Sequence, residues 1–284
     1  MRIGIGLPNQ VRDVNPQLIP SWAKRAEELG FASLGTVGRY AYPGVSDTVT
    51  LAAAAGATTE IALLSTVLVA PAWPAALLAK EVAGIDGVSG GRLTLGVGVG
   101  MRADDFVADG YGLRDRGKRF DDDLAVYREV WDGAAVGGGT NPAVPAGTRR
   151  VPLLFGGFSP AALARAAREG DGYIGGSMPV EMVGQSFDAA RAAWKEAGRE
   201  DPPRLVGIAY FALGDVERGR AGVHDYYSFM GDDTASMIAG TLSGGTDAVR
   251  ATVKAFDELG ADELVLNPTV ADLDEVSRLA DAVL

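Results

Sequence analysis

Residues 61–100 read IALLSTVLVAPAWPAALLAKEVAGIDGVSGGRLTLGVGVG, and they contain the unit that decides the fold. A strand-like run, Ile61–Leu64, precedes a helix near Ala75–Val88, and a second strand-like run, Leu93–Val99, follows it. The helix stops at Ser89-Gly90-Gly91, where glycine can adopt the left-handed conformation that ends a helix. Two strands joined by a helix predict parallel pairing with a right-handed crossover.

The same alternation of strands and helices extends to both ends of the chain. The other predicted strands are Ile3–Leu7, Ser33–Val37, Pro152–Phe155, Gly172–Gly175, Arg204–Leu213 and Glu263–Leu266. A helix predicted near Asp47–Ala57 has Asp47 placed to cap it. The Gly- and Pro-rich stretch 133–150 is predicted to be a surface excursion, because the alternation resumes after it. Eight strand–helix units predict a (β/α)8 TIM barrel in a single domain over residues 1–284, with a doubly wound open sheet as the main alternative.

Composition excludes several classes of protein. The 284 residues include no Cys and carry a net charge of −11, with the acidic residues scattered along the chain. Such a surface disfavours nucleic acid, whose phosphates require Lys and Arg. No apolar run approaches the ~20 residues that span a bilayer, and the first residues do not resemble a signal peptide. We therefore expect a cytoplasmic protein with neither a nucleic-acid nor a membrane partner.

The inventory of reactive side chains is small. The chain has one His, His224, so a His-rich metal site is excluded. Its five Lys fall within or beside predicted helices, where they cannot reach a substrate in the barrel mouth. Asp104, Asp105 and Asp109 could hold Mg²⁺, but an exposed loop and helix start explain them more simply, so no metal site is expected. If the chain is an enzyme, a cofactor supplies the reactivity.

Glycine clusters end three of the predicted strands. They are Gly96–Gly100, Gly156–Pro160 and Gly175–Ser177. Active sites of this barrel lie at such strand ends, and N–H groups at a helix N-terminus bind phosphate. The alternative is that the glycines only permit tight turns. The spacing at 96–100 is GxGxG rather than GxGxxG, which argues against a Rossmann dinucleotide site.

The residues of this chain resemble the luciferase-like flavin-dependent oxidoreductases. This family includes bacterial luciferase, alkane sulfonate monooxygenases and F420-dependent dehydrogenases. The resemblance is strongest over Ser65–Gly100, where LLAKE is followed by SGGRLTLGVGVG. It continues through Val151–Gly157 and Gly170–Ile174, includes Gly4–Pro8, and is weakest after Leu213.

The resemblance implies a (β/α)8 barrel that binds FMN or coenzyme F420 in its mouth. Three residues should contact the flavin ring, often through a non-proline cis peptide: Ser65, Thr66 and Val67. Those expected to flank the ring or ribityl chain are Gly98, Val99, Gly100 and Met101. Those expected to hold the phosphate are Gly156, Gly157, Phe158, Ser159, Gly176 and Ser177.

Two departures from the family leave the choice between FMN and F420 open. Many F420-dependent members have an Asp-His pair where this chain has Gly38-Arg39-Tyr40. Bacterial luciferase has a phosphate-binding Arg at the position of Val99. Arg39 or Arg102 could compensate for that missing charge.

Three residues are candidates for the chemistry on the substrate side. Arg39 and Tyr40 follow the second strand, and His224 lies in a segment, 223–229, that could form a lid. We expect a luciferase-like monooxygenase that uses reduced FMN and O2 on a small organic substrate. The alternatives are an F420-dependent dehydrogenase or reductase, a non-catalytic flavin-binding barrel and a phosphosugar enzyme. A separate flavin or F420 reductase and a homodimer are family expectations.

Overall fold

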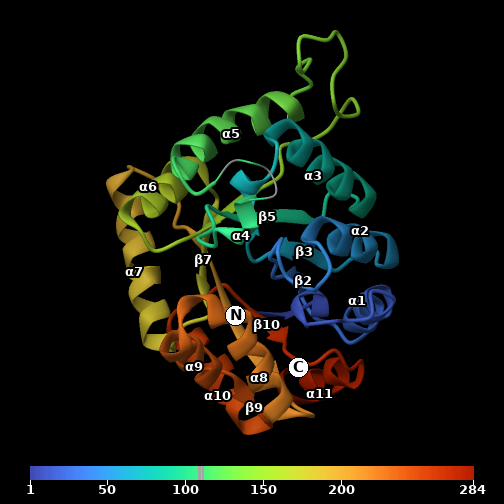
Figure 1. Cartoon of the computed structure of the whole chain (residues 1–284), viewed down its shortest axis with the longest axis vertical. Helices are drawn as coiled ribbons and strands as arrows, with labels where there is room; N and C mark the ends of the chain where they lie inside the picture. Colours follow the sequence, from blue (N-terminus) through green and yellow to red (C-terminus); the bar gives the residue numbers. More distant parts are fainter. Residues whose placement is uncertain (108–109, 111) are drawn as a thin grey trace.

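Parallel strands close into a barrel with helices around it (Figure 1). The computed structural model describes residues 1–107, 110 and 112–284. Among these residues the barrel strands are β1 (Arg2–Gly6), β2 (Ser33–Thr36), β3 (Ala62–Ser65), β5 (Leu93–Gly98), β6 (Leu153–Gly156), β7 (Gly172–Gly176), β8 (Arg204–Ala212) and β10 (Glu263–Pro268). Strand β10 pairs with both β1 and β8, which closes the sheet. The predicted (β/α)8 barrel is thus confirmed, and the open sheet is excluded.

Helices connect the strands on the outside of the barrel. They are α1 (Leu18–Glu28), α2 (Asp47–Ala57), α3 (Ala75–Ser89), α4 (Asp104–Val107), α5 (Arg116–Trp131), α6 (Pro160–Glu169), α7 (Val180–Glu196), α8 (Val216–Tyr227), α9 (Asp232–Gly240), α10 (Thr246–Glu258) and α11 (Asp274–Val283). The 3-10 turns η1 (Pro8–Gln10), η2 (Ala70–Ala72) and η3 (Ser228–Met230) and the short strands β4 (Leu68–Val69) and β9 (Ser243–Gly244) complete the described elements. None of the described helices combines the length and apolar character of a membrane span.

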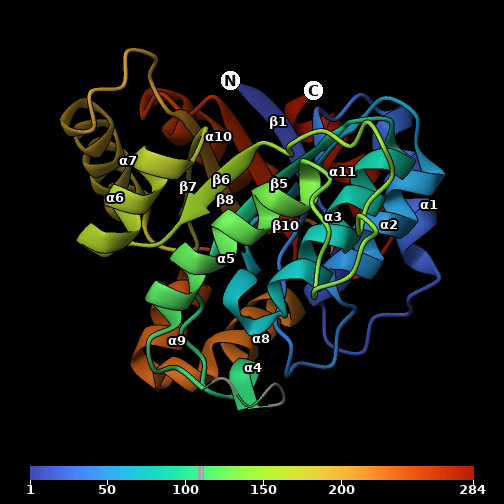
Figure 2. The ribbon, with the colours of Figure 1, turned by 90° about the horizontal axis from the view of Figure 1, so that it is seen from above.

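Additional elements gather at one end of the barrel. Figure 2 shows α4, α8 and α9 together at the end opposite the two chain termini. Short strands extend the sheet toward this end, with β4 pairing with β5 and β9 pairing with β8. The excursion at 133–150 has no helix or strand, only a bridge between Ala135 and Pro142. The C-terminal ends of the strands therefore form the more elaborate face, as in enzymes of this fold.

Side chains fill the barrel interior in layers. An apolar cluster in the interior consists of Leu64, Leu154, Ile174, Val206, Ile208 and Val265. At the N-terminal end, buried Glu263 accepts a hydrogen bond from Ser33 and forms ion pairs with Arg2 and Arg204 at 2.6 and 2.7 Å. Two residues beyond Val265 along β10, Asn267 is fully buried toward the mouth. The barrel is a packed core, so a ligand can bind only at its end.

Arg92, the last residue of SGGR, holds the N-terminal side of the barrel together. Its guanidinium donates to the carbonyls of Ala55 and Thr58, at the end of α2, at 3.1 and 2.9 Å. It also donates to the carbonyls of Ile61 and Ser89 at 2.6 Å each. Because these contacts join α2, β3 and α3 away from the mouth, the most recognisable part of the motif serves stability.

Asp47 does not cap α2, contrary to the sequence prediction. The helix begins at Asp47, and the capping position is Ser46, which makes no side-chain capping bond. The Asp47 carboxylate packs on Gly38 instead, where an added Cβ would lie 1.8 Å from Oδ2. Burial raises the pKa of Asp47 to about 6. The buried environment of Asp47 therefore disfavours the charged form of its carboxylate.

Replacing Asp47 with Asn should stabilise the protein above pH 6 and have no such effect in acid. The folded pKa lies above the unfolded value of about 3.9. Folding therefore takes up a proton between these two values, and the free energy of unfolding falls as the pH rises through that window. We expect Asp47→Asn to gain about 1–2 kcal/mol near pH 8, allowing for the lost charge at the helix N-terminus. Urea unfolding at about pH 8 and about pH 4.5 tests this; an equal gain at both would contradict it.

Candidate functional site

The end of β3 forms the floor of the mouth. The Thr66–Val67 peptide bond is cis, as the resemblance implied. Thr66 Oγ1 donates to the carbonyl of Thr36 at 2.9 Å, and Ser65 Oγ donates to that of Gly96 at 2.8 Å. These bonds tie the segment to β2 on one side and β5 on the other.

Glycines from β5 and β6 pack against Val67. A Cβ added at Gly98 would lie 3.0 Å from one methyl group of Val67, and one added at Gly156 would lie 3.1 Å from the other. The structure therefore brings together three of the predicted cofactor segments, at the ends of β3, β5 and β6. Side chains larger than hydrogen at these glycines would crowd the cis segment.

The rest of the β5 segment forms the rim. Val99 is partly buried against the main core. Gly100 has a φ of +65°, and its carbonyl accepts from Arg116 Nε at 2.9 Å. Met101 is exposed, as is Phe158 on the β6 loop. Two large apolar side chains thus stand exposed on the rim, where they could cover a flat ligand.

The loop after β6 presents unpaired backbone N–H groups. Gly157 has a φ of +129°, which favours glycine. Ser159 caps α6, its Oγ accepting from Ala162 N at 3.2 Å. Within the described ranges, the N–H groups of Phe158, Ser159 and Ala161 have no protein acceptor. These free donors and the helix dipole suit a phosphate.

The end of β7 lies beside this loop. Tyr173 Oη donates to the carbonyl of Gly157 at 3.0 Å, which links β7 to the β6 loop. A Cβ on Gly176 would lie 2.3 Å from the carbonyl oxygen of Ile208, so this glycine is needed for strand packing. Ser177 has a φ of +58° and donates its N–H to the same carbonyl at 3.4 Å.

Two tyrosines bridge the mouth next to Ser177. Tyr210 Oη lies 2.9 Å from Tyr227 Oη, so the end of β8 meets α8. Burial raises the pKa of Tyr210 well above its usual value, and a hydrogen bond with Ser177 only partly opposes this. The phenol therefore stays neutral and can donate a hydrogen bond.

Three amide side chains at strand ends were missed by the sequence reasoning. Asn267 is fully buried, and neither its Nδ2 nor its Oδ1 has a partner among the described residues. A Cβ on Gly6 would lie 2.2 Å from Asn267 Oδ1, so Gly6 makes room for the amide. Asn9 and Gln10, which follow β1, each bury an unpartnered carbonyl oxygen. Polar residues directly after strands were a usable signal, which the glycine clusters obscured.

Arg39 and Arg102 are held in a network at the rim. Arg39 forms an ion pair with Asp104 at 2.9 Å and donates to the carbonyl of Tyr226 at 3.0 Å. Arg102 lies over the rings of Tyr226 and Phe229, at 4.8 and 4.3 Å from their centroids. The network ties the β2 and β5 ends to α8 and η3. Compensation of a cofactor phosphate by either arginine would require it to leave these partners.

The acidic residues after β5 serve the same network. Buried Asp105 accepts from the N–H groups of Tyr40 and Ala41 at 2.9 and 3.2 Å and lies 3.7 Å from Arg102. The side chain of Tyr40 is exposed. Asp104 pairs with Arg39, whereas Asp109 lies outside the described residues.

His224 lies apart from the other two catalytic candidates. Its Nε2 is 3.0 Å from a carboxylate oxygen of Asp232, at the start of α9. Arg39 instead contacts Tyr226, two residues further along α8. The described contacts therefore bring Arg39 and Tyr40 together through the Asp104–Asp105 segment, and they direct His224 toward α9.

The mouth fits an anionic, ring-bearing cofactor. The β6 loop supplies free donors for a phosphate, and the β3 segment supplies a floor for a flat ring. Asn267 supplies a buried donor and acceptor that lack partners, as the polar edge of a flavin would require.

Comparison with known proteins identifies the family. The model for luciferase-like monooxygenases matches residues 1–252. A protein of Mycobacterium tuberculosis (strain ATCC 25618 / H37Rv), described only as uncharacterized, is 30% identical over 227 residues, which are 69% of this chain and 78% of the relative.

Solved structures share the fold over nearly the whole chain. Monooxygenase RslO1 from Streptomyces bottropensis is 24% identical with a TM-score of 0.77, covering 100% of this chain and 98% of its own. An F420-dependent secondary alcohol dehydrogenase is 16% identical with a TM-score of 0.82 and the same coverages. A type II Baeyer-Villiger monooxygenase from Pseudomonas putida, in complex with FMN, is 15% identical with a TM-score of 0.73, covering 99% and 95%. Together with the family match, they confirm the resemblance seen in the sequence: the chain belongs to the luciferase-like monooxygenase family.

Proposed function

We propose that the chain is a flavin-dependent monooxygenase that uses reduced FMN and O2 to oxidise a small organic substrate. The observation that carries the proposal is the meeting of a phosphate cradle, residues 156–159, and a ring floor, residues 65–67, at one end of the barrel. FMN would supply the redox chemistry, which the side chains of the mouth lack.

The residues of the mouth would bind and orient the cofactor. The free N–H groups of Phe158, Ser159 and Ala161 would hold the phosphate, with Ser177 nearby, directly after β7. Asn267 would bond the polar edge of the ring. The exposed Met101 and Phe158 would cover apolar parts of the cofactor and exclude water.

The second candidate is an F420-dependent dehydrogenase or reductase, favoured by the structural likeness to the F420-dependent alcohol dehydrogenase. Titrating the full chain with FMN and F420 side by side tests the choice. We expect FMN to bind at least about tenfold more tightly, a difference of about 1.4 kcal/mol. The reverse order would favour the F420 enzyme. A chain that binds FMN but reacts with no substrate after reduction would favour a non-catalytic flavin-binding barrel.

We further propose that the protein is a cytoplasmic homodimer served by a separate reductase. In support, α2 and α3 pack together and leave apolar side chains exposed: Val49, Leu77 and Val88. Added Cβ atoms at Gly56, Gly84 and Gly87 would meet nothing within 4 Å, so a second copy could approach these helices closely. Sedimentation equilibrium of the full chain tests the dimer.

A further inference from the structure

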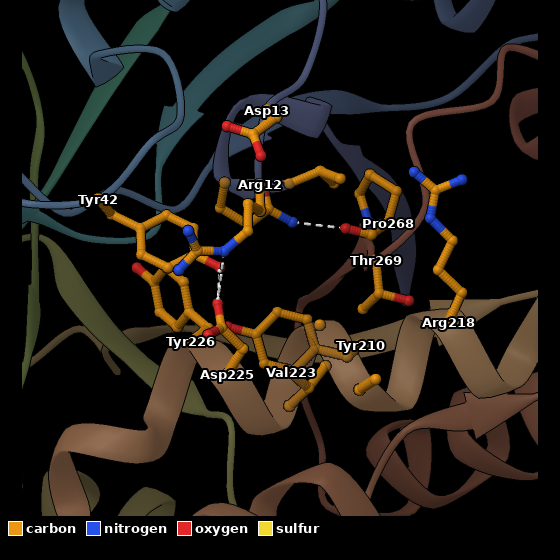
Figure 3. Close-up of a pocket in the computed structure, with 14 residues that line it drawn as sticks. Arg12, Asp13, Tyr42, Tyr210, Arg218, Val223, Asp225, Tyr226, Pro268 and Thr269 are labelled. Carbon is orange, nitrogen blue, oxygen red and sulfur yellow. Dashed lines mark hydrogen bonds and ion pairs between the residues drawn. The ribbon is translucent and has the colours of Figure 1, made fainter.

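A cavity of about 440 Å³ lies beside the mouth, between the segment after β1 and helix α8 (Figure 3). This volume is typical of sites for small organic molecules. The cavity shares one wall with the mouth, because Tyr210 lines it while the Tyr210 hydroxyl meets Tyr227. A molecule bound there would lie next to the proposed cofactor site, with Tyr210 between the two.

The cavity has aromatic walls and a floor of small residues. Tyr42 and Tyr226 line it and pack edge to face, with ring centroids 5.0 Å apart and an interplanar angle of 72°. Ala221 and Gly222 of α8 line it without large side chains. Flat aromatic molecules pack well against such walls.

Two arginines, Arg12 and Arg218, and two aspartates, Asp13 and Asp225, line this cavity. Arg218 lines the cavity, and its side chain has no ion pair or hydrogen bond within the part of the chain that the structure describes. Arg12 is neutralised by Asp225 at 2.9 Å, and Asp225 also accepts from Tyr42 Oη at 2.7 Å. Figure 3 shows Asp13 on the far side of Arg12 from α8. A carboxylate would therefore find an unused partner at Arg218.

A buried acceptor supplies a second recognition group. Gln10 lines the cavity and is only 8% exposed. Its Nε2 donates to the carbonyl of Pro268 at 2.5 Å, which fixes the orientation of the amide and makes Oε1 the acceptor. No described residue donates to Oε1. Because a buried oxygen without a donor is costly, a ligand that donates a hydrogen bond there is favoured.

We propose that this cavity binds the substrate, and that the substrate is a hydroxylated aryl carboxylate. Its carboxylate would pair with Arg218, its ring would pack against the tyrosines, and its hydroxyl would donate to Gln10 Oε1. The role of this ligand as a substrate rests on the proposed function, whereas its binding in the cavity requires no cofactor.

Calorimetric titration of the cofactor-free full chain tests the proposal. The probes are para-hydroxybenzoate, meta-hydroxybenzoate and para-hydroxyphenylacetate, which differ in the spacing between hydroxyl and carboxylate. We expect at least one of them to bind about tenfold more tightly than benzoate, which lacks the hydroxyl, or tyramine, which carries a cation. Arg218→Gln should weaken the binding of that probe by about ten- to a hundredfold. Ala221→Trp should block it by filling the cavity.

Arg220→Gln is the matched control. Arg220 lies two residues further along α8 and donates to the carbonyl of Ala239 on α9, so its loss should leave probe binding unchanged. The proposal is overturned if none of the three probes binds, if tyramine or benzoate binds equally well, or if Arg218→Gln has no effect. If a probe binds but FMN does not, only the proposed flavin-dependent function is overturned. If FMN binds but no probe does, only the proposal that this cavity binds the substrate is overturned.

Discussion

Replacing Gly157 with Asp should abolish FMN binding. The residue has a φ of +129° and stands in the loop whose free N–H groups would hold the phosphate. An added carboxylate would oppose the phosphate charge, and the side chain would strain the loop, since its Cβ would lie 2.9 Å from that of Ala162. We expect the affinity to fall by at least about a hundredfold, or 2.7 kcal/mol. Quenching of FMN fluorescence measures it.

The variant Gly157→Asn distinguishes the effect of the added charge on FMN binding from the effect of backbone strain. Asn has nearly the size of Asp and would impose the same backbone strain, but it carries no charge. We expect the Asn variant to bind FMN at least about tenfold more tightly than the Asp variant, with the gap narrowing at high salt. Circular dichroism should show both variants folded. If Asp and Asn bound FMN equally, the phosphate would not lie at this loop.

The barrel was predictable because its determinants are local. The alternation of strands and helices around residues 61–100 and the glycine exit at Gly90 depend on a few neighbouring residues. The structure shows Gly90 in the left-handed conformation, with a φ of +72°. The cis peptide at Thr66–Val67 came only from the family resemblance, since no local pattern specifies it.

The roles of individual glycines were not predictable, because they depend on which strands become neighbours. Gly96 and Gly176 read as possible ligand contacts in the sequence. In the structure, a Cβ on Gly96 would lie 1.9 Å from the carbonyl oxygen of Ser65, so close strand packing already requires glycine there. The same applies to Gly176 against β8. Only the structure of the closed barrel shows that these two glycines are required by strand packing, whereas Gly157 is required by its backbone conformation.

The rim arginines illustrate a second limit of the sequence. Arg39 and Arg102 follow strands, so their position near the mouth was correctly inferred. Their partners on α8 and η3 come from more than 120 positions later in the chain. Pairing over such a separation depends on how α8 folds back over the mouth, which no local pattern reveals.

Asn267→Leu should change stability and cofactor binding in opposite directions. The Asn267 amide is fully buried and both of its polar atoms lack partners among the described residues, which costs about 1–3 kcal/mol. Leu is similar in size and removes that cost. The cofactor-free variant should therefore melt at a higher temperature, by about 2–4 °C for each kcal/mol gained. If the amide meets the flavin ring, FMN affinity should fall by about tenfold or more.

Asn9→Leu is the matched control, because Asn9 is the same residue type on the same rim but its side chain already donates hydrogen bonds to the protein. Its Nδ2 donates to the carbonyls of Val37 and Val45 at 3.0 and 3.2 Å, so its loss should destabilise the protein. Melting curves and FMN titrations of both variants give the comparison. A less stable Asn267→Leu variant would mean that the amide already has a partner in the free protein. Unchanged FMN affinity would mean that the cofactor does not reach it. A gain in stability with a loss of binding would show that this chain keeps an unfavourable buried amide for its ligand.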